Sequence, residues 1–289
     1  MRPASFEYHR AESLEQALEL LAEFGDEIRP IAGGQSLVPM MNFRLARPAH
    51  LVDINRLPLN TIEIDGEVMR VGALTRHYQM FESPLLAKHF PALLDAAHYI
   101  GHPTIRRNGS VGGSISHADP TAEWPASAVL CDAEIIVRSL HDTRQIPARE
   151  FFESAYVTTL EPGEMVVAIE FPLPPSQSTG SFIEIGERSG DFAIASVGIM
   201  IEHNGEAISK ASMVCSGADL VPIRAPEIED MLIGQSLREP PAKEAGQTFS
   251  LTIDPANDHI ASADYRRNLI AQLTERAILK ACARAVSNP

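Results

Sequence analysis

Two glycine pairs constrain this chain more than any other feature of its sequence. Gly33-Gly34 and Gly112-Gly113 each lie at an expected strand-to-loop junction, and Ser36 and Ser114 follow them within two residues. Glycine lets the backbone approach a bulky anion, and successive backbone N–H groups then point into the concavity. A diphosphate would fit such a cradle. Spacing alone favours the simpler interpretation, in which both pairs are tight turns that need positive φ.

The charge of the chain decides how such an anion would be held. The 289 residues carry a formal net charge of -14. Nucleic acids and anionic membranes select clustered Lys and Arg, and no basic run offsets the acidic balance, so we expect neither partner. A phosphate-containing ligand would therefore depend on local backbone N–H groups and helix N-termini.

Cysteine usage and hydropathy indicate the compartment. Cys131, Cys215 and Cys282 are an odd number spread far apart, which provides neither a disulfide framework nor a CxxC site and favours a reducing compartment. No window approaches the roughly 18 apolar residues of a membrane-spanning helix, and the N-terminus lacks a signal-peptide pattern. We expect a cytoplasmic protein without a membrane span.

Familiar catalytic and phosphate-binding motifs are missing. Neither GxxxxGK[ST] nor GxGxxG occurs, which disfavours P-loop and Rossmann interpretations. Ser116, His117 and Asp119 suggest a hydrolytic triad, but triad residues come from distant positions in the chain, and no GxSxG turn is present. No catalytic side chain is assigned.

No metal site is expected either. His98 and His102 have the i, i+4 spacing of a helical zinc pair, but Gly101 and Pro103 would break the helix there. Four glutamates are candidates for paired acid-base carboxylates, although surface charge is the more common role in so acidic a chain. They are Glu161, Glu164, Glu184 and Glu187.

The pattern of apolar residues predicts an α+β protein of two domains. A first helix has Ser13 and Gln16 as its capping box, and Asp65-Gly66 marks a hairpin between residues 61 and 72. A proline-rich, polar stretch over 172–180 marks a domain boundary. Strands at 181–185, 193–201 and 211–215 are expected beyond it.

Several finer expectations follow from local patterns. Ser36 should cap a short helix that begins just after it, and residues 107–109 should form a turn. Met40, Met41 and Phe43 are expected in the core. A last helix should bury one face, formed by Tyr265, Leu269, Leu273 and Ala277.

Two longer segments make the chain recognisable. AGGQSLVPMMNFRLARPAHLVDIN (32–55) and RNGSVGGSISHADPTAEWPA (107–126) closely resemble the flavin-binding medium subunit of the xanthine dehydrogenase family, which includes the carbon monoxide dehydrogenases. The resemblance continues through EPGEMVVAIEFP, RSGDFA and DYRR. It implies an FAD-binding domain of the vanillyl-alcohol-oxidase (PCMH) type over 1–176, with subdomains of about 1–57 and 58–176, and a smaller α+β domain over 177–289.

The resemblance also implies the cofactor contacts. Both glycine segments would wrap the FAD pyrophosphate and ribityl chain with backbone N–H groups, and Phe192 would cover one face of the isoalloxazine. Glu123 stands where relatives often carry an aspartate, and some relatives have a lysine near Glu184 that is absent here. The implied contacts are Ala32, Gly33, Gly34, Gln35, Ser36, Ser110, Val111, Gly112, Gly113, Ser114, Glu123, Val166, Asp191 and Phe192.

The function implied by the resemblance is electron transfer within a multi-subunit molybdenum hydroxylase. FAD would be the only cofactor of this chain, while a large subunit holds the molybdenum-pterin cofactor and a small subunit holds 2Fe-2S clusters. A dimer of such heterotrimers is expected. Two alternatives stay open: a self-sufficient FAD-dependent oxidase or dehydrogenase, and a flavin-free scaffold subunit. The substrate and the final electron acceptor are not encoded in this chain.

Overall fold

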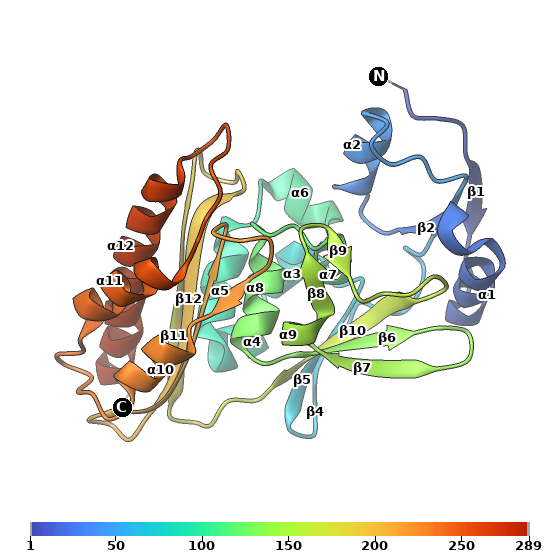
Figure 1. The fold of residues 1–289 in the computed structure, drawn as a ribbon. Helices are drawn as coiled ribbons and strands as arrows, with labels where there is room; N and C mark the ends of the chain where they lie inside the picture. Colours follow the sequence, from blue (N-terminus) through green and yellow to red (C-terminus); the bar gives the residue numbers. More distant parts are fainter. Residues whose placement is uncertain (1, 288–289) are drawn as a thin grey trace.

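The computed structural model describes residues 2–287, whose strands form three main sheets and one short ladder (Figure 1). The strands are β1 Glu7–Arg10, β2 Ile28–Ile31, β3 His50–Asp53, β4 Ile62–Asp65, β5 Val68–Gly72, β6 Glu134–Arg138, β7 Thr143–Pro147, β8 Phe152–Ser154, β9 Val157–Thr158, β10 Met165–Pro172, β11 Ser178–Gly186, β12 Ala193–His203, β13 Ile208–Ser216 and β14 Ile223–Arg224. The helices are α1 Leu14–Phe24, α2 Leu37–Asn42, α3 His77–Phe81, α4 Pro84–His89, α5 Pro91–Tyr99, α6 Pro103–Asn108, α7 Val111–His117, α8 Glu123–Leu130, α9 Ala148–Phe151, α10 Pro226–Leu232, α11 Ala242–Thr252 and α12 Ala263–Ser287, with a 3-10 turn at Gly25–Glu27.

A small parallel sheet opens the chain. Its strand order is β1-β3-β2, and α1 packs against it. The predicted cap of α1 is confirmed, because the Gln16 amide donates to Ser13 Oγ at 3.1 Å. The Gln16 side chain accepts instead from the backbone of Glu12 at 2.7 Å, one residue earlier than a standard capping box. Burial of Leu18 and Leu21 then fixes the helix on the sheet.

An antiparallel sheet of order β4-β5-β10-β6-β7 forms the middle of the molecule. The hairpin predicted at Asp65-Gly66 is confirmed, since Asp65 pairs with Val68 and Gly66 has a φ of +60°. Helices α5, α7 and α8 contribute to the same hydrophobic core as β5, β6 and β10, with Trp124 and Phe171 among its fully buried side chains. This sheet and its helices carry the second glycine segment.

The C-terminal domain places one antiparallel sheet, β11-β12-β13-β14, between two layers of helices (Figure 1). Helix α12 covers one face, whereas α5 and α8 of the preceding domain cover the other. Along β12, Val197 and Ile199 belong to the core beneath α12, while Gly198 and Met200 face the preceding domain. A strand buried on both faces explains the nearly continuous apolar run of 193–201.

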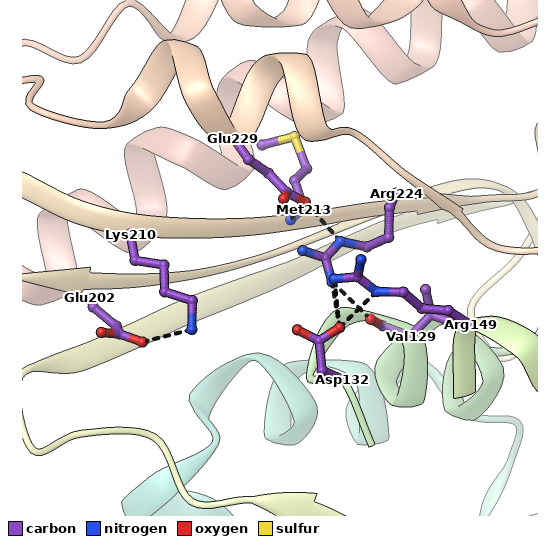
Figure 2. Close-up of polar contacts among 8 residues, drawn as sticks. All are labelled: Val129, Asp132, Arg149, Glu202, Lys210, Met213, Arg224 and Glu229. Atoms are coloured by element: carbon purple, nitrogen blue, oxygen red, sulfur yellow. Dashed lines mark hydrogen bonds and ion pairs between the residues drawn. The ribbon is translucent and has the colours of Figure 1, made fainter. Parts of the chain in front are cut away.

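Two ion-pair clusters fasten this sheet to the preceding domain. Figure 2 shows Arg224 of β14 between Glu229 of α10, at 2.7 Å, and Asp132 just beyond α8, at 2.9 Å. At the other side of the interface, Asp95 of α5 binds Arg284 of α12 at 2.8 and 2.9 Å. Because the Arg224–Asp132 and Arg284–Asp95 bridges each join a residue of one domain to a residue of the other, they hold the two domains in one orientation.

Three of the finer expectations about the N-terminal half are wrong. Ser36 precedes α2, but its hydroxyl makes no capping bond, because its backbone is already helical at φ -103° and ψ -49°. Phe43 is 63% exposed, whereas Met41 is buried as expected. The expected turn at 107–109 is in fact the end of α6, which Pro103 begins.

The expected buried face of the last helix is correct only in part. Leu273 and Ala277 are buried, but Tyr265 is 47% exposed. Arg266 takes the inward position at the start of α12 and donates to the carbonyl oxygens of Ile194 and Gly217. Those carbonyl groups need a donor, so a buried cation displaces the tyrosine from this position. None of the helices within residues 2–287 combines the length and apolar character needed to cross a bilayer.

Candidate functional site

A cavity of about 900 Å³ lies where the N-terminal sheet, α7, β10 and the loop before β12 meet. Its volume is in the range of sites that hold a cofactor-sized ligand. Thirteen of the fourteen side chains or backbone positions singled out from the sequence line it; Val111 does not, because its side chain is fully buried in the core. The fold therefore brings together segments that lie more than 150 residues apart.

The first glycine segment provides a row of free donors. Within residues 2–287, the backbone N–H groups of Gly33, Gly34, Gln35 and Ser36 have no protein acceptor. Gly34 adopts a φ of +67° and is followed by the helical backbone of Ser36, a left-handed to right-handed change that turns successive N–H groups to one side. Unpaired amides cost free energy unless water or a ligand accepts from them. This segment therefore forms an anion-binding concavity.

The second glycine segment is built differently from the expectation. Gly112 and Gly113 lie in the first turn of α7, with Ser110 as the N-cap that accepts from the Gly113 amide at 3.2 Å. The amides of Val111, Gly112 and Ser114 already donate to protein carbonyl groups at 2.9 to 3.0 Å. The predicted contribution of their N–H groups is thus limited by these bonds. What remains for a ligand is the exposed face of Gly113, the neighbouring hydroxyl groups and the helix N-terminus.

Glycine is required where the two segments meet. A Cβ built on Gly33 would lie 1.9 Å from the carbonyl oxygen of Asn108, just before the second segment. A Cβ on Gly112 would lie 2.4 Å from the Cβ atom of Ala73. These distances are far inside van der Waals contact, so both positions exclude any side chain. In contrast, a Cβ on Gly113 would meet only Ser110 Oγ, at 2.9 Å.

A polar clamp that the sequence reasoning missed ties the two segments together. The Arg76 guanidinium donates to the carbonyl oxygen of Asn108 and, at 2.5 Å, to Asn55 Oδ1. Asn55 in turn donates from Nδ2 to the carbonyl oxygen of Ala32 at 2.9 Å. Asn55 closes the recognisable 32–55 segment, which was a usable signal, but nothing local to Arg76 points to this role.

The wall of the cavity is mainly acidic. Its charged side chains include two arginines, Arg29 and Arg47, against six carboxylates. The carboxylates are Asp26, Asp119, Glu123, Glu161, Glu164 and Asp191. An anionic ligand would therefore gain little from the net charge of its surroundings and would depend on directed backbone donors.

Glu123 and Glu184 form a buried carboxyl pair beside the cavity. Burial and, to a smaller extent, the nearby Asp119 raise the pKa of Glu123 to about 7, against the lowering effects of a backbone hydrogen bond and of Arg106. Burial, together with repulsion from Glu123, raises the pKa of Glu184 to about 9. The expectation that Glu184 is a surface charge is wrong, because it is only 6% exposed and faces the preceding domain.

The Ser116, His117 and Asp119 group does not form a hydrolytic triad. Asp119 Oδ1 accepts from the backbone and hydroxyl of Thr121 at 2.9 and 2.6 Å, and Oδ2 accepts from the Tyr156 hydroxyl at 3.2 Å. No hydrogen bond joins the three proposed members in the part of the chain that the structure describes. Asp119 instead orders the loop beneath the cavity.

Family models match both parts of the chain. Residues 4–174 match the family described as "FAD binding domain in molybdopterin dehydrogenase". Residues 181–281 match the family described as "CO dehydrogenase flavoprotein C-terminal domain".

Individual relatives extend over almost the full length. The alpha subunit of the 6-hydroxypseudooxynicotine dehydrogenase complex of Paenarthrobacter nicotinovorans is 39% identical, over 99% of this chain and 97% of the relative. The glyceraldehyde dehydrogenase medium chain of Sulfolobus acidocaldarius is 36% identical, over 96% and 98%. Among solved structures, carbon monoxide dehydrogenase from Hydrogenophaga pseudoflava superimposes with a TM-score of 0.93 at 31% identity, over 99% of both chains.

Proposed function

Because the chain belongs to the FAD-binding medium subunits of the molybdenum hydroxylases, a family of oxidoreductases, we propose that its FAD passes electrons between a partner subunit and an external acceptor. The electrons would arrive from 2Fe-2S clusters of a small subunit, and a large subunit with a molybdenum-pterin cofactor would act on the substrate. We further propose a dimer of such heterotrimers in the cytoplasm.

The observation that carries the proposal is the row of free amides at 33–36. These donors face a cavity shared with the exposed side of Gly113, and the wall around them is acidic. Such a wall repels an anion in general and accepts one only where N–H groups converge. A diphosphate linking two organic groups fits this arrangement, because its charge would lie at the amides and its bulk in the rest of the cavity.

The residues of this chain would position the cofactor rather than react with it. FAD supplies the redox chemistry when it is bound. Gly33 to Ser36 and the N-terminus of α7 would hold the diphosphate, and the Arg76 clamp would keep these two segments at a fixed spacing. Val166 provides an apolar surface of the cavity wall, while Phe192, 62% exposed at the cavity rim, is available to cover an aromatic ring.

The cradle is tested by placing a charge at its least crowded position. Gly113→Asp and Gly113→Asn add side chains of nearly equal size where a Cβ meets only the end of the Ser110 side chain. Repulsion between a carboxylate and a phosphate charge near a protein surface is worth up to about 4 kcal/mol. That is nearly a thousandfold in Kd.

The measurement is flavin content after purification, together with FAD titration of the flavin-depleted chain. We expect Gly113→Asp to lose FAD and Gly113→Asn to keep a larger share of it. Equal flavin content in both variants and the wild type would show that no phosphate lies near this position.

Electron transfer is tested separately, by anaerobic reduction of the bound flavin. Substrate should bleach the flavin absorbance only when both partner subunits are present. A purified chain that bleaches with an organic substrate alone would favour a self-sufficient oxidase or dehydrogenase, which the small C-terminal domain argues against. A colourless chain that still assembles with its partners would identify a scaffold.

A further inference from the structure

Three side chains with metal-binding atoms converge on the N-terminal sheet. Glu7 and His9 lie on β1, and His50 lies at the start of β3. His9 Nε2 is 3.0 Å from His50 Nδ1, which is 3.6 Å from Glu7 Oε2. One possible ligand atom from each of the three residues lies within 4.8 Å of the others. None of the three lines the cavity described above, so this group forms a separate cluster.

The strand register explains why these side chains meet. Glu7 stands directly opposite His50 in the parallel pair β1–β3, and His9, two residues further on, projects from the same face. Tyr8 and Arg10 project from the opposite face, where the Tyr8 hydroxyl bonds with Asp53. The guanidinium of Arg10 is therefore directed away from the cluster.

An aromatic ring restrains both imidazoles. Phe24, the last residue of α1, stacks on His50 with ring centroids 3.9 Å apart and on His9 at 5.4 Å. Behind His50, the fully buried Ile28 occupies the facing position on β2. The cluster thus has an apolar side toward the core and an open side at Glu7, which is 75% exposed. Rings held in this way lose little freedom when they bind an ion.

Whichever ring tautomer is present, one contact in the cluster joins two acceptor atoms that have no proton of their own to share. His50 Nδ1 faces both His9 Nε2 and a carboxylate oxygen, and a ring nitrogen carries at most one proton. If Nδ1 accepts from His9, two acceptor atoms face each other across the contact with Glu7. If Nδ1 donates to Glu7, His9 Nε2 is left as a second acceptor. A cation at the centre would satisfy all three atoms at once.

We propose that Glu7, His9 and His50 bind a divalent transition metal ion, with Zn²⁺ the best match and water completing the coordination. Zinc takes imidazole nitrogen and carboxylate oxygen at about 2.0–2.2 Å in a tetrahedral arrangement, which places ligand atoms about 3.3–3.5 Å apart. The observed separations of 3.0 and 3.6 Å lie on either side of this value. The ion would join β1 to β3 and stabilise the N-terminal strand.

No sequence pattern pointed to this cluster, and no metal site was expected. Its histidines are 41 residues apart and belong to no spaced motif. Only the parallel pairing of β1 with β3 brings them together.

Zinc binding is measured on the full-length chain, purified without a polyhistidine tag. After treatment with a chelator, ZnCl₂ is titrated in competition with a chromogenic zinc indicator. We expect one equivalent to bind. His9→Ala should weaken binding by about 100-fold or more, since even an outer-shell partner is typically worth 10–100-fold. Glu7→Gln keeps the shape of an exposed side chain and should weaken it by a smaller factor.

Two further variants separate ligation from folding. His9→Gln retains a polar partner for His50 but offers zinc no imidazole, and it should bind as weakly as His9→Ala. His141→Ala removes an exposed histidine from the β6–β7 turn and should bind like the wild type. X-ray absorption of the zinc-loaded chain should show nitrogen and oxygen neighbours at about 2.0–2.1 Å. Wild-type binding no stronger than that of His9→Gln, or sulfur neighbours at about 2.3 Å, would overturn the proposal.

Discussion

Replacing Gly33 by alanine is the sharpest test of how the two glycine segments are assembled. The new methyl group would lie 1.9 Å from the carbonyl oxygen of Asn108, more than 1 Å inside the 3.0 Å limit that Cβ contacts respect. That oxygen belongs to the backbone, so no side-chain rotation relieves the overlap. The loop that follows β2 and the end of α6 must move apart.

The cost can be worked out from the contacts at this point. Overpacking costs about 1–3 kcal/mol, and a rigid backbone neighbour places Gly33→Ala at about 3 kcal/mol. Moving Asn108 also weakens its bond with Arg76, and a hydrogen bond to a charged group is worth about 1.5–3 kcal/mol. We therefore expect a loss of about 3–5 kcal/mol in the free energy of unfolding and a large loss of FAD affinity.

Gly113→Ala is the matched control, because its methyl group meets only the Ser110 hydroxyl at 2.9 Å. Alanine is also the better helix former by up to about 1 kcal/mol, so the stability of this variant should stay within about 1 kcal/mol of the wild type. Urea unfolding of the flavin-depleted chains and FAD titration measure the two effects. If Gly33→Ala unfolds like the wild type, or if Gly113→Ala is equally damaging, the close approach of residues 33 and 108 is not what requires glycine.

Three further predictions follow from named contacts. Arg76→Lys loses the guanidinium fork that reaches both Asn108 and Asn55, so FAD affinity should fall by about tenfold. Arg56→Lys, at an exposed ion pair with Glu12, is the control in the same FAD titration. Equal FAD affinities of the two variants would exclude the clamp. Asp95→Asn should lower the free energy of unfolding by about 2 kcal/mol at pH 7. Burial raises the pKa of Asp95, but hydrogen bonds from Arg284, Lys280 and the Phe182 backbone outweigh it and lower the pKa below its usual value. This stability is therefore present above the ordinary carboxyl pKa and lost as the pH falls through the lower folded pKa. Urea unfolding near pH 3 should show a smaller difference in the free energy of unfolding between the wild type and Asp95→Asn. A difference that stays constant with pH would contradict this. Glu184→Gln should stabilise the chain increasingly from pH 5 to pH 8, because the folded pKa of about 9 lies above the unfolded value and wild-type stability falls across that window. The gain in stability over three pH units is at most about 4 kcal/mol. Thermal unfolding of both proteins across the pH series measures it. A difference in stability between Glu184→Gln and the wild type that does not depend on pH would show that Glu184 is ionised in the fold.

Local signals explain what sequence reasoning predicted correctly. The Ser13 cap, the Asp65-Gly66 hairpin and the strands around the 172–180 boundary depend on residues close together in the chain, where capping, turn geometry and apolar period act directly. The family resemblance rested on long ordered segments, and it brought with it the fold and the cofactor.

Errors arose where a distant residue decides the outcome. Tyr265 was expected on the buried face of α12, but the carbonyl groups of Ile194 and Gly217 accept hydrogen bonds from Arg266, which is buried instead. Glu184 was expected at the surface, because nothing near it in sequence shows that α5 covers its strand, β11. Helix periodicity and charge are local properties, whereas burial depends on what packs against them.

By itself, the sequence determined that a chain this acidic must hold a phosphate through backbone amides, and it marked the glycines that free them. Only the tertiary structure decided which amides stay unpaired, which residue fixes the spacing of the two segments, and which carboxyl groups and histidines become neighbours. The physical reason is that glycine spacing is a property of one segment, while a hydrogen-bond partner or a second ligand is supplied by whatever the fold places opposite it.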